Sequence, residues 1–124
     1  MRKVIFTEKA PAPIGPYVQA VQVDNTLYIS GQLGIDMETG EMGDCVVCQT
    51  RNSLKNMVAI LEEAGMTTDN IVKTTIFLDD MGNFGAVNEV YAQFFGEAFP
   101  ARSCVQVAAL PKAAKVEIEA IACK

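Results

Sequence analysis

Hydrophobic and polar residues alternate along this chain with two different periods, and each change of period marks a predicted element. Alternation of period two over 17–23 and 27–32, on either side of a turn at 24–25, predicts a β-hairpin. A second turn signal at 37–40 is typical of a hairpin tip. The N-terminal part of the chain is therefore expected to form strands.

Two further stretches repeat their hydrophobic residues every three or four positions, which is typical of amphipathic helices. We expect the first helix to begin with Asp44 as its N-cap and to stop at Gly65. We expect the second to run from near Asn83 to Gly96. The apolar stripes consist of Val47, Leu54, Met57, Val58, Leu61 and Ala64 in the first helix, and of Phe84, Val87, Tyr91, Phe94 and Phe95 in the second.

Three more strands are predicted at 71–78, 102–109 and 115–122. No repeat, low-complexity segment or linker interrupts the chain, so residues 1–124 are expected to form a single α+β domain. Two helices can cover only one face of a sheet of five or six strands.

The second face of this predicted sheet mixes aliphatic and charged side chains. It carries Lys73, Thr75 and Phe77 on one strand and Glu119 and Ile121 on another. A row of this kind suits an interface with polar pockets between copies of the chain better than a fully hydrated surface.

Composition narrows the chemistry. The net charge is −5 with no basic run, which disfavours a nucleic-acid partner. No apolar stretch approaches the roughly 20 residues of a membrane span, and the N-terminus meets charge and proline too early for a signal peptide, so we expect a cytoplasmic protein without a membrane partner. The chain has no histidine, which excludes imidazole bases and histidine-ligated metals. We expect neither a metal nor a cofactor.

The segment FPARSCVQVAAL contains the most distinctive candidate, Arg102. Counting by two places Arg102 and Cys104 on one side of the strand, and the valines on the other. If the valines face the helices, Arg102 shares the second face with Glu117. A guanidinium there could bind a carboxylate through two parallel hydrogen bonds, and the alternative is a structural ion pair with Glu117 or Glu119.

The distance between Arg102 and Glu117 along the predicted strands does not fit a site that both residues share within one chain. A hairpin between the last two strands would leave Arg102 and Glu117 about 13 Å apart, too far for one small ligand. Either the two strands are not neighbours, or the two residues meet across a subunit boundary. We favour the second possibility.

Five dispersed stretches, APIGPYVQAV, LYISGQLG, VKTTIFLDDM, FPARSCVQVAALP and KVEIEAIA, strongly resemble the RidA/YjgF family of enamine/imine deaminases. The resemblance covers the whole chain. It implies a chorismate-mutase-like α+β fold, with a mixed sheet and two helices on one face, assembled as a homotrimer around a central β-barrel. It also implies a ligand cleft at each subunit interface, with the final strand beside the 71–78 strand.

Carried over by motif, Arg102 would bind the carboxylate of a 2-imino acid, and Glu117 would position or activate water. The products would be a 2-keto acid and ammonia. The cleft would be lined by Tyr17, Ser30, Gly31, Asn88 and Cys104. The loop before Pro100 lacks a few residues found in some members of the family, so the rim of the pocket is the least defined part of this expectation.

Several alternatives stay open. Cys45 and Cys48 form a C-x-x-C pattern, for which we favour a structural or incidental role over metal or redox chemistry, because a zinc site would need two more ligands. Tyr17 is also compatible with the core, Ser30-Gly31 with a strand-end bend, and Asn88 with a tie between the helix and a loop.

Other functions are alternatives to the deaminase hypothesis. A non-catalytic sensor of small carboxylates could use the same residues. Chorismate-mutase-like catalysis is weakened because a dicarboxylate would need more than one cation in the cleft. Nuclease activity fits poorly with the negative charge and the absence of histidine.

Overall fold

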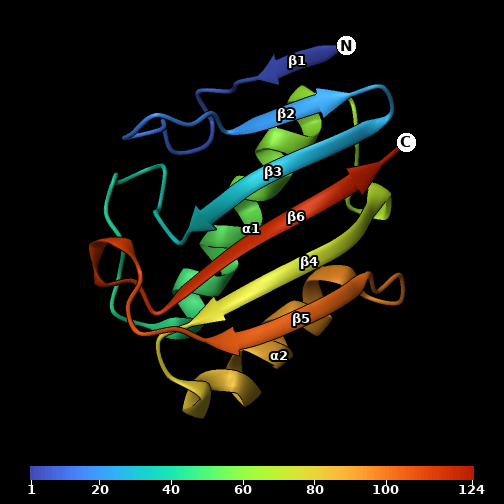
Figure 1. Cartoon of the computed structure of the whole chain (residues 1–124). Coiled ribbons are helices and arrows are strands. Elements are labelled where there is room, and N and C mark those ends of the chain that lie inside the picture. Colours follow the sequence, from blue (N-terminus) through green and yellow to red (C-terminus); the bar gives the residue numbers. More distant parts are fainter.

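Six strands form one mixed sheet in the order β1-β2-β3-β6-β4-β5 in the computed structural model, which describes all 124 residues (Figure 1). The strands are β1 (Arg2–Ile5), β2 (Ala20–Val23), β3 (Thr26–Leu33), β4 (Ile71–Leu78), β5 (Ala101–Gln106) and β6 (Val116–Cys123). Neighbouring strands are antiparallel except β4 and β5, which are parallel. The α+β architecture predicted from the sequence is confirmed.

Two α-helices lie on the same face of the sheet (Figure 1). They are α1 (Val46–Glu63) and α2 (Phe84–Phe95), and one-turn 3₁₀ helices occur at Thr68–Asn70, Met81–Asn83 and Pro111–Ala113. Neither α-helix combines the length and apolar character needed to cross a membrane.

The hydrophobic core lies between the helices and the sheet face that they cover, called here the helix face. Leu54, Met57 and Leu61 of α1 are almost fully buried against strand residues such as Ile76 and Ile118. Alternate residues of the same strands point to the opposite side, called here the uncovered face. Its side chains on β4 and β6 are half-buried or exposed, and they include Lys73, Thr75, Phe77, Glu117, Glu119 and Ile121.

Polar side chains of α1 attach this helix to one end of the sheet. Ser53 donates a 2.7 Å hydrogen bond to the carbonyl oxygen of Gln32, and the Asn56 amide donates to the carbonyl oxygens of Leu33 and Ile35. Gln49 accepts a hydrogen bond from the backbone N–H of Lys115. Because these donors and acceptors are buried or partly buried, their pairing holds the ends of β3 and β6 in place.

The sequence predicted most element boundaries well. Strand β4 has the bounds expected from its alternation. The two helices end where Gly65 and Gly96 adopt positive φ values of 73° and 66°, as their C-terminal glycines indicated. The predicted turn at 37–40 is closed by a bridge between Asp36 and Glu41.

Four details of the prediction are wrong. The N-cap of α1 is Cys45 rather than Asp44, because Cys45 is extended and its sulfur accepts the N–H of Cys48. Residues 17–19 are not part of β2, because the side chain of Gln19 turns inward to bond the backbone of Thr7, Ala10 and Pro11. Residues 107–109 lie beyond β5, and strand β1 was not predicted at all.

Strand β6 lies between β3 and β4, so the last two strands of the chain do not form a hairpin. The expectation that the final strand lies beside 71–78 is confirmed. This insertion places Glu117 and Glu119 in the middle of the uncovered face.

Gly34, just after β3, provides a test of the contact between the sheet and α1. A Cβ atom added there would lie 2.3 Å from the backbone oxygen of Gln49, and a rigid helix backbone cannot yield as a flexible side chain could. We expect Gly34→Ala to destabilise the protein by about 3 kcal/mol, measured by urea unfolding. The matched control is Gly85→Ala, where the added Cβ meets nothing within 4 Å; it should stabilise α2 by about 0.5 kcal/mol. Equal effects of both substitutions would contradict the close packing at Gly34.

Candidate functional site

The side chain of Arg102 lies on the side of β5 that faces α2 and packs against residues of that helix. Its guanidinium carbon lies 5.0 Å from the centre of the Tyr91 ring and 5.5 Å from that of Phe84, and its Nη1 donates a 2.8 Å hydrogen bond to Oδ1 of Asn88. Residues 84, 88 and 91 follow each other at spacings of four and three, so they share one face of α2. Cation–π contacts and one hydrogen bond thus orient the guanidinium.

The expected face of Arg102 was therefore wrong. In the parallel pairing of β4 with β5, Arg102 is opposite Thr74, whose side chain is buried toward the helices. Val105, which the sequence assigned to the helices, is instead 45% exposed. The reason is that β5 lies at the edge of the sheet, next to the aromatic rings of α2. These rings pack against the arginine, so Arg102 occupies the helix face and Val105 is left on the uncovered face.

Arg102 has no carboxylate partner in the protomer. The chain contains a single ion pair, between the N-terminal amine and Asp24 at 4.0 Å. The structural ion pair of Arg102 with Glu117 or Glu119, considered from the sequence, is not formed. A guanidinium has five N–H donors, and Asn88 occupies one Nη1 position, so most of its donors stay free for an anionic ligand.

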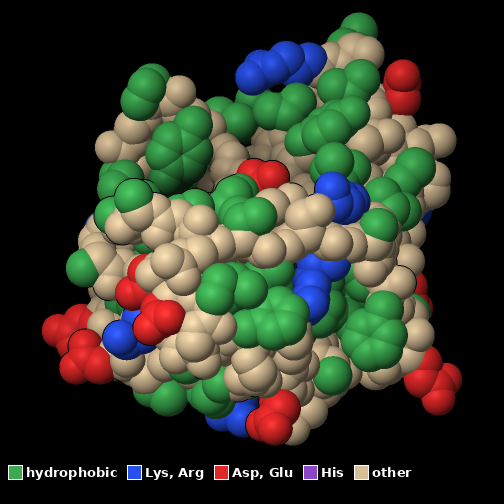
Figure 2. All heavy atoms as spheres, turned by 60° about the horizontal axis from the view of Figure 1, so that its bottom comes forward, with side chains coloured by type: hydrophobic (Ala, Val, Ile, Leu, Met, Phe, Trp, Pro, Cys, Tyr) green, Lys and Arg blue, Asp and Glu red, His purple; other side chains and the backbone are tan.

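A hollow of about 310 Å³ opens beside this arginine. Its wall is formed by Asn88, Tyr91, Ala92, Phe99, Pro100 and Arg102. Figure 2 views the molecule with the β5 edge of the sheet turned forward. Lysine and arginine side chains lie there among hydrophobic ones, and an acidic side chain is visible in a second hollow, apart from them. Phe99 is 56% exposed at this edge, which leaves an apolar surface next to the free guanidinium.

Cys104 lies two residues after Arg102 and also faces inward, where it packs against the core. Burial raises the pKa of its thiol, and the nearby charge of Arg102 acts in the opposite direction. A protonated, half-buried thiol is a poor nucleophile. Cys104 therefore lies on the same side of β5 as Arg102 without offering a reactive sulfur.

Glu117 lies on the uncovered face, directly over a β-bulge in β3. The pairing of β3 with β6 shifts by one residue between Ile29 and Gln32, so Ser30 and Gly31 form an extra step in the strand. A Cβ atom at Gly31 would lie 2.6 Å from Oε2 of Glu117. Glycine at this position therefore lets the carboxylate lie against the backbone of β3.

The surroundings of Glu117 favour its protonated form. Burial raises the pKa of this carboxyl, and the negative charge of Glu119 raises it further. No cation or hydrogen bond of the same chain counters these two effects. A half-buried carboxyl with a raised pKa is a common feature of acid–base sites.

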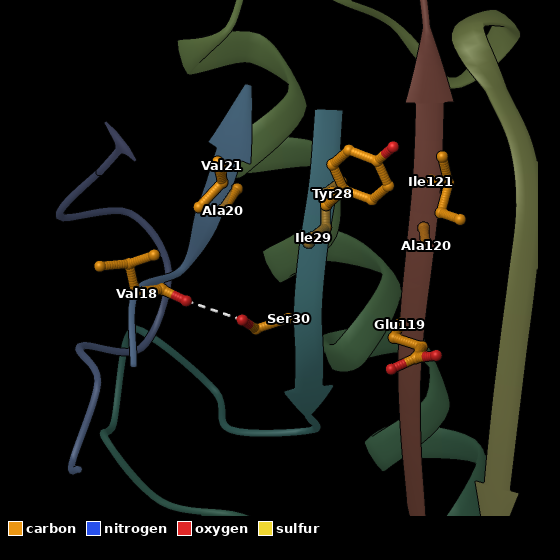
Figure 3. A pocket seen from close by; sticks show the side chains of 9 residues that line it. All are labelled: Val18, Ala20, Val21, Tyr28, Ile29, Ser30, Glu119, Ala120 and Ile121. Atoms are coloured by element: carbon orange, nitrogen blue, oxygen red, sulfur yellow. Dashed lines mark hydrogen bonds between the residues drawn. The ribbon is translucent and has the colours of Figure 1, made fainter. Parts of the chain in front are cut away.

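Ser30 connects this bulge to the N-terminal loop. Its hydroxyl donates a 2.7 Å hydrogen bond to the carbonyl oxygen of Val18, drawn as the dashed line in Figure 3. The neighbouring Tyr17 is 49% exposed, which excludes the core position considered from the sequence. Ser30-Gly31 is thus a bulge within β3 rather than a strand-end bend.

A shallow hollow of about 290 Å³ lies on the uncovered face beside Ser30. In Figure 3, Tyr28 projects from β3 and Ile121 from the adjacent β6, which also carries Glu119, while the side chain of Ser30 points toward Val18. Tyr28 is 50% exposed. The hollow is lined by Val18, Ala20, Val21, Tyr28, Ile29, Ser30, Glu119, Ala120 and Ile121.

The predicted site residues thus form two groups within one protomer. Thr74 pairs with Arg102, whereas Phe77, three residues further along β4, pairs with Glu117. The two residues are therefore about 10 Å apart along the strands and about 10 Å apart across them, and they point to opposite faces. Tyr17, Ser30 and Gly31 accompany Glu117, while Asn88 and Cys104 accompany Arg102. A single protomer does not bring the two groups onto one small ligand.

Tyr91 and Phe84 were expected in the core, and their contact with Arg102 was not predicted. Tyr91 is buried, and its hydroxyl forms a 2.6 Å hydrogen bond with Thr74. The feature of the sequence that could have indicated this contact was Asn88. It is a polar residue within the apolar stripe of the helix, four positions after Phe84 and three before Tyr91.

Comparison with known proteins identifies the family. Residues 7–124 match the family described as Endoribonuclease L-PSP. The chain belongs to this family, also called RidA/YjgF. It is 55% identical to the 2-iminobutanoate/2-iminopropanoate deaminase of Mus musculus, over 98% of this chain and 91% of the relative, and 53% identical to the protein of the same name from Escherichia coli, over 98% of each.

Solved structures of RidA/YjgF relatives have the same fold. The YjgF gene product of E. coli superimposes with a TM-score of 0.95 at 51% identity, over 98% of both chains. E. coli TdcF with bound serine superimposes with a TM-score of 0.94 at 48% identity, again over 98% of both chains. The six-stranded sheet and two helices are therefore the fold of the RidA/YjgF family.

The influence of Glu119 on Glu117 can be measured directly. Because the charge of Glu119 raises the pKa of Glu117, Glu119→Gln should lower it, leaving burial as the remaining cause. Titration of the Glu117 carboxyl carbon by NMR gives this value. Glu63→Gln, on the exposed side of α1, is the matched control and should leave the titration of Glu117 unchanged. An unchanged midpoint in Glu119→Gln would contradict the coupling between the two carboxyl groups.

Proposed function

We propose that this protein hydrolyses reactive 2-imino acids, or their enamine tautomers, to 2-keto acids and ammonia. The relatives that support this are named 2-iminobutanoate/2-iminopropanoate deaminase and are more than half identical over nearly the whole chain. The observation that carries the proposal is Arg102, a guanidinium held in place by neutral groups and left without a carboxylate of its own. Such a group is prepared to bind the carboxylate of a substrate.

The reacting cleft of this proposal lies between two protomers of a homotrimer. One protomer supplies Arg102 with Asn88, and its neighbour supplies Glu117 with the Tyr17–Gly31 region. Support comes from the geometry of the single chain, in which the two groups are on opposite faces, and from the uncovered face, where Phe77, Tyr28 and Ile121 are only partly buried. Association of three copies through these faces would bury them around a central barrel.

In the proposed reaction, Arg102 binds the substrate carboxylate and holds carbon 2 in front of Glu117. The ionised Glu117 takes a proton from water as that water attacks carbon 2 of the protonated imine, which gives a neutral tetrahedral carbinolamine. Glu117 then returns this proton to the amine nitrogen. As the carbon–nitrogen bond breaks and ammonia leaves, Glu117 takes the hydroxyl proton, and the carbonyl of the 2-keto acid forms. A carboxyl whose pKa is raised by burial and by the charge of Glu119 is suited to this exchange because it holds a proton more readily than an ordinary glutamate and can return it to the substrate.

The other cleft residues have supporting roles in this proposal. Gly31 lets the Glu117 carboxylate lie against β3, and Ser30 fixes the loop that presents Tyr17. Asn88 orients the guanidinium, and Cys104 lines the cleft beside it. The reaction consumes one water and releases one ammonia, so it requires neither an oxidant nor a covalent intermediate.

A second candidate is a non-catalytic sensor of small carboxylates with the same cleft. The crystal structure of TdcF with bound serine favours it, because that relative holds an amino acid. The two candidates share Arg102 and differ at Glu117, which a sensor would not need for chemistry.

Substitution of the two residues separates these candidates. With a threonine dehydratase generating the imine and semicarbazide trapping what remains, Glu117→Gln should slow imine loss on the order of 100-fold or more and retain 2-ketobutanoate binding. Arg102→Ala should lose imine hydrolysis and weaken 2-ketobutanoate binding by about 10- to 100-fold in calorimetry. Glu63→Gln and Arg51→Ala, both on α1, are the matched controls. Wild-type protein that does not accelerate imine loss would support the sensor.

A further inference from the structure

Two of the four cysteines lie close together at the start of α1, outside the proposed cleft. None of the four forms a disulfide, and Cys45 and Cys48 are both exposed. From the sequence we favoured a structural or incidental role for the pair, and a structural thiol commonly packs in the interior as a small apolar residue does. Because both side chains are exposed, the pair does not contribute to the packed core.

The start of the helix brings the two sulfur atoms together. Cys45 is the N-cap, with φ −83° and ψ 122°, and its sulfur accepts a 3.3 Å hydrogen bond from the backbone N–H of Cys48. The side chains of an N-cap residue and of the third helical residue approach each other, as in a capping box. A disulfide between them would need little movement of the backbone.

The two thiols are not equivalent. The neighbouring side chain of Cys48 lowers the pKa of Cys45, and the backbone N–H of Cys48 lowers it further. The neighbouring side chain of Cys45 raises the pKa of Cys48. The charge of Arg51, one turn further along the helix, favours the thiolate at both positions. Cys45 is thus the better nucleophile, and Cys48 stays protonated beside it.

A metal does not account for the pair. No group of three or more histidine, cysteine, aspartate or glutamate side chains in the chain is arranged to hold a metal ion. Two thiols alone leave a zinc site incomplete. The exposure of both thiols, their spacing and the contact of the Cys45 sulfur with the backbone N–H of Cys48 together fit exchange with an external disulfide.

We propose that Cys45 and Cys48 form a dithiol site that reduces small, accessible disulfides carrying negative charge. The Cys45 thiolate attacks one sulfur of the disulfide, forming a mixed disulfide and releasing one thiolate, which takes up a proton. The Cys48 thiol then gives up its proton and attacks the Cys45 sulfur, which releases the second thiol. Two cysteine thiols become one disulfide, and the external disulfide becomes two thiols by gaining two electrons. The positive charge of Arg51 and the N-terminal end of α1 favour an anionic disulfide.

The probe for this site is glutathione disulfide, offered to the full-length reduced protein. After acid quenching and alkylation of the remaining thiols, mass spectrometry of peptides should find a Cys45–Cys48 disulfide, with Cys104 and Cys123 alkylated. In Cys48→Ser, the reaction should stop at a glutathione adduct on Cys45. In Cys45→Ser, no disulfide should form; serine is a good N-cap, so the variant should keep its thermal stability.

Cys123→Ser is the matched control, because Cys123 is the other exposed cysteine, and it should leave formation of the Cys45–Cys48 disulfide unchanged. Glutathione spread equally over Cys45, Cys48 and Cys123, without an internal disulfide, would overturn the proposal. An adduct that persists on Cys45 when Cys48 is present would overturn it as well, because the second step would then be missing. The outcome is read from cysteine masses and is independent of imine hydrolysis.

Discussion

One constraint governs this structure: two helices cover only one face of a six-stranded sheet. The helix face contains the core, and the uncovered face contains Glu117 and Glu119 with partly buried aromatic and aliphatic neighbours. Because β6 is inserted between β3 and β4, its glutamates lie in the middle of that face rather than at an edge. Arg102 lies on the helix face of the edge strand β5. The single chain therefore separates the two groups that the proposed chemistry requires, and association between copies would reunite them.

The surroundings of Arg102 on one face of the sheet and of Glu117 on the other prepare these two side chains for chemistry that needs no histidine. On β5, aromatic rings and one amide oxygen orient a guanidinium while leaving it free of any carboxylate. On β6, burial and a neighbouring negative charge raise the pKa of Glu117, and the glycine in the bulge of β3 gives its carboxylate room. Because the pKa of Glu117 is raised in the folded protein, protonation of this carboxyl stabilises the folded state at low pH. That stabilisation is lost as the pH rises through the pKa of folded Glu117, so the ionised form lowers the free energy of unfolding. Catalytic groups are commonly held in such unfavourable environments.

Periodicity predicted much of the fold because the spacing of apolar residues is a local property. The bounds of β4 and the glycine ends of both helices follow from alternation and from backbone conformation. Period two also grouped Arg102 with Cys104 correctly, but it cannot tell which face the helices cover. The assignment of Val105 to the core was wrong because an edge strand beside an aromatic helix face can shelter an arginine instead. Strand β1 was missed because it is four residues long and mostly exposed. The contact of Glu117 with Gly31 depends on a bulge that no local pattern reveals.

The central claim is that Arg102 of one protomer and Glu117 of another act on the same substrate molecule. Complementation between two inactive variants tests it most directly. Arg102→Ala and Glu117→Ala are unfolded together in equal amounts, refolded, and assayed for imine hydrolysis against each variant refolded alone. Random assembly into trimers with clefts shared between neighbours restores about a quarter of the wild-type activity, because each mixed trimer contains one intact cleft. Mixed trimers, verified by native mass spectrometry, that remain as inactive as the separate variants would contradict the claim, since a site within one protomer could never be restored by mixing.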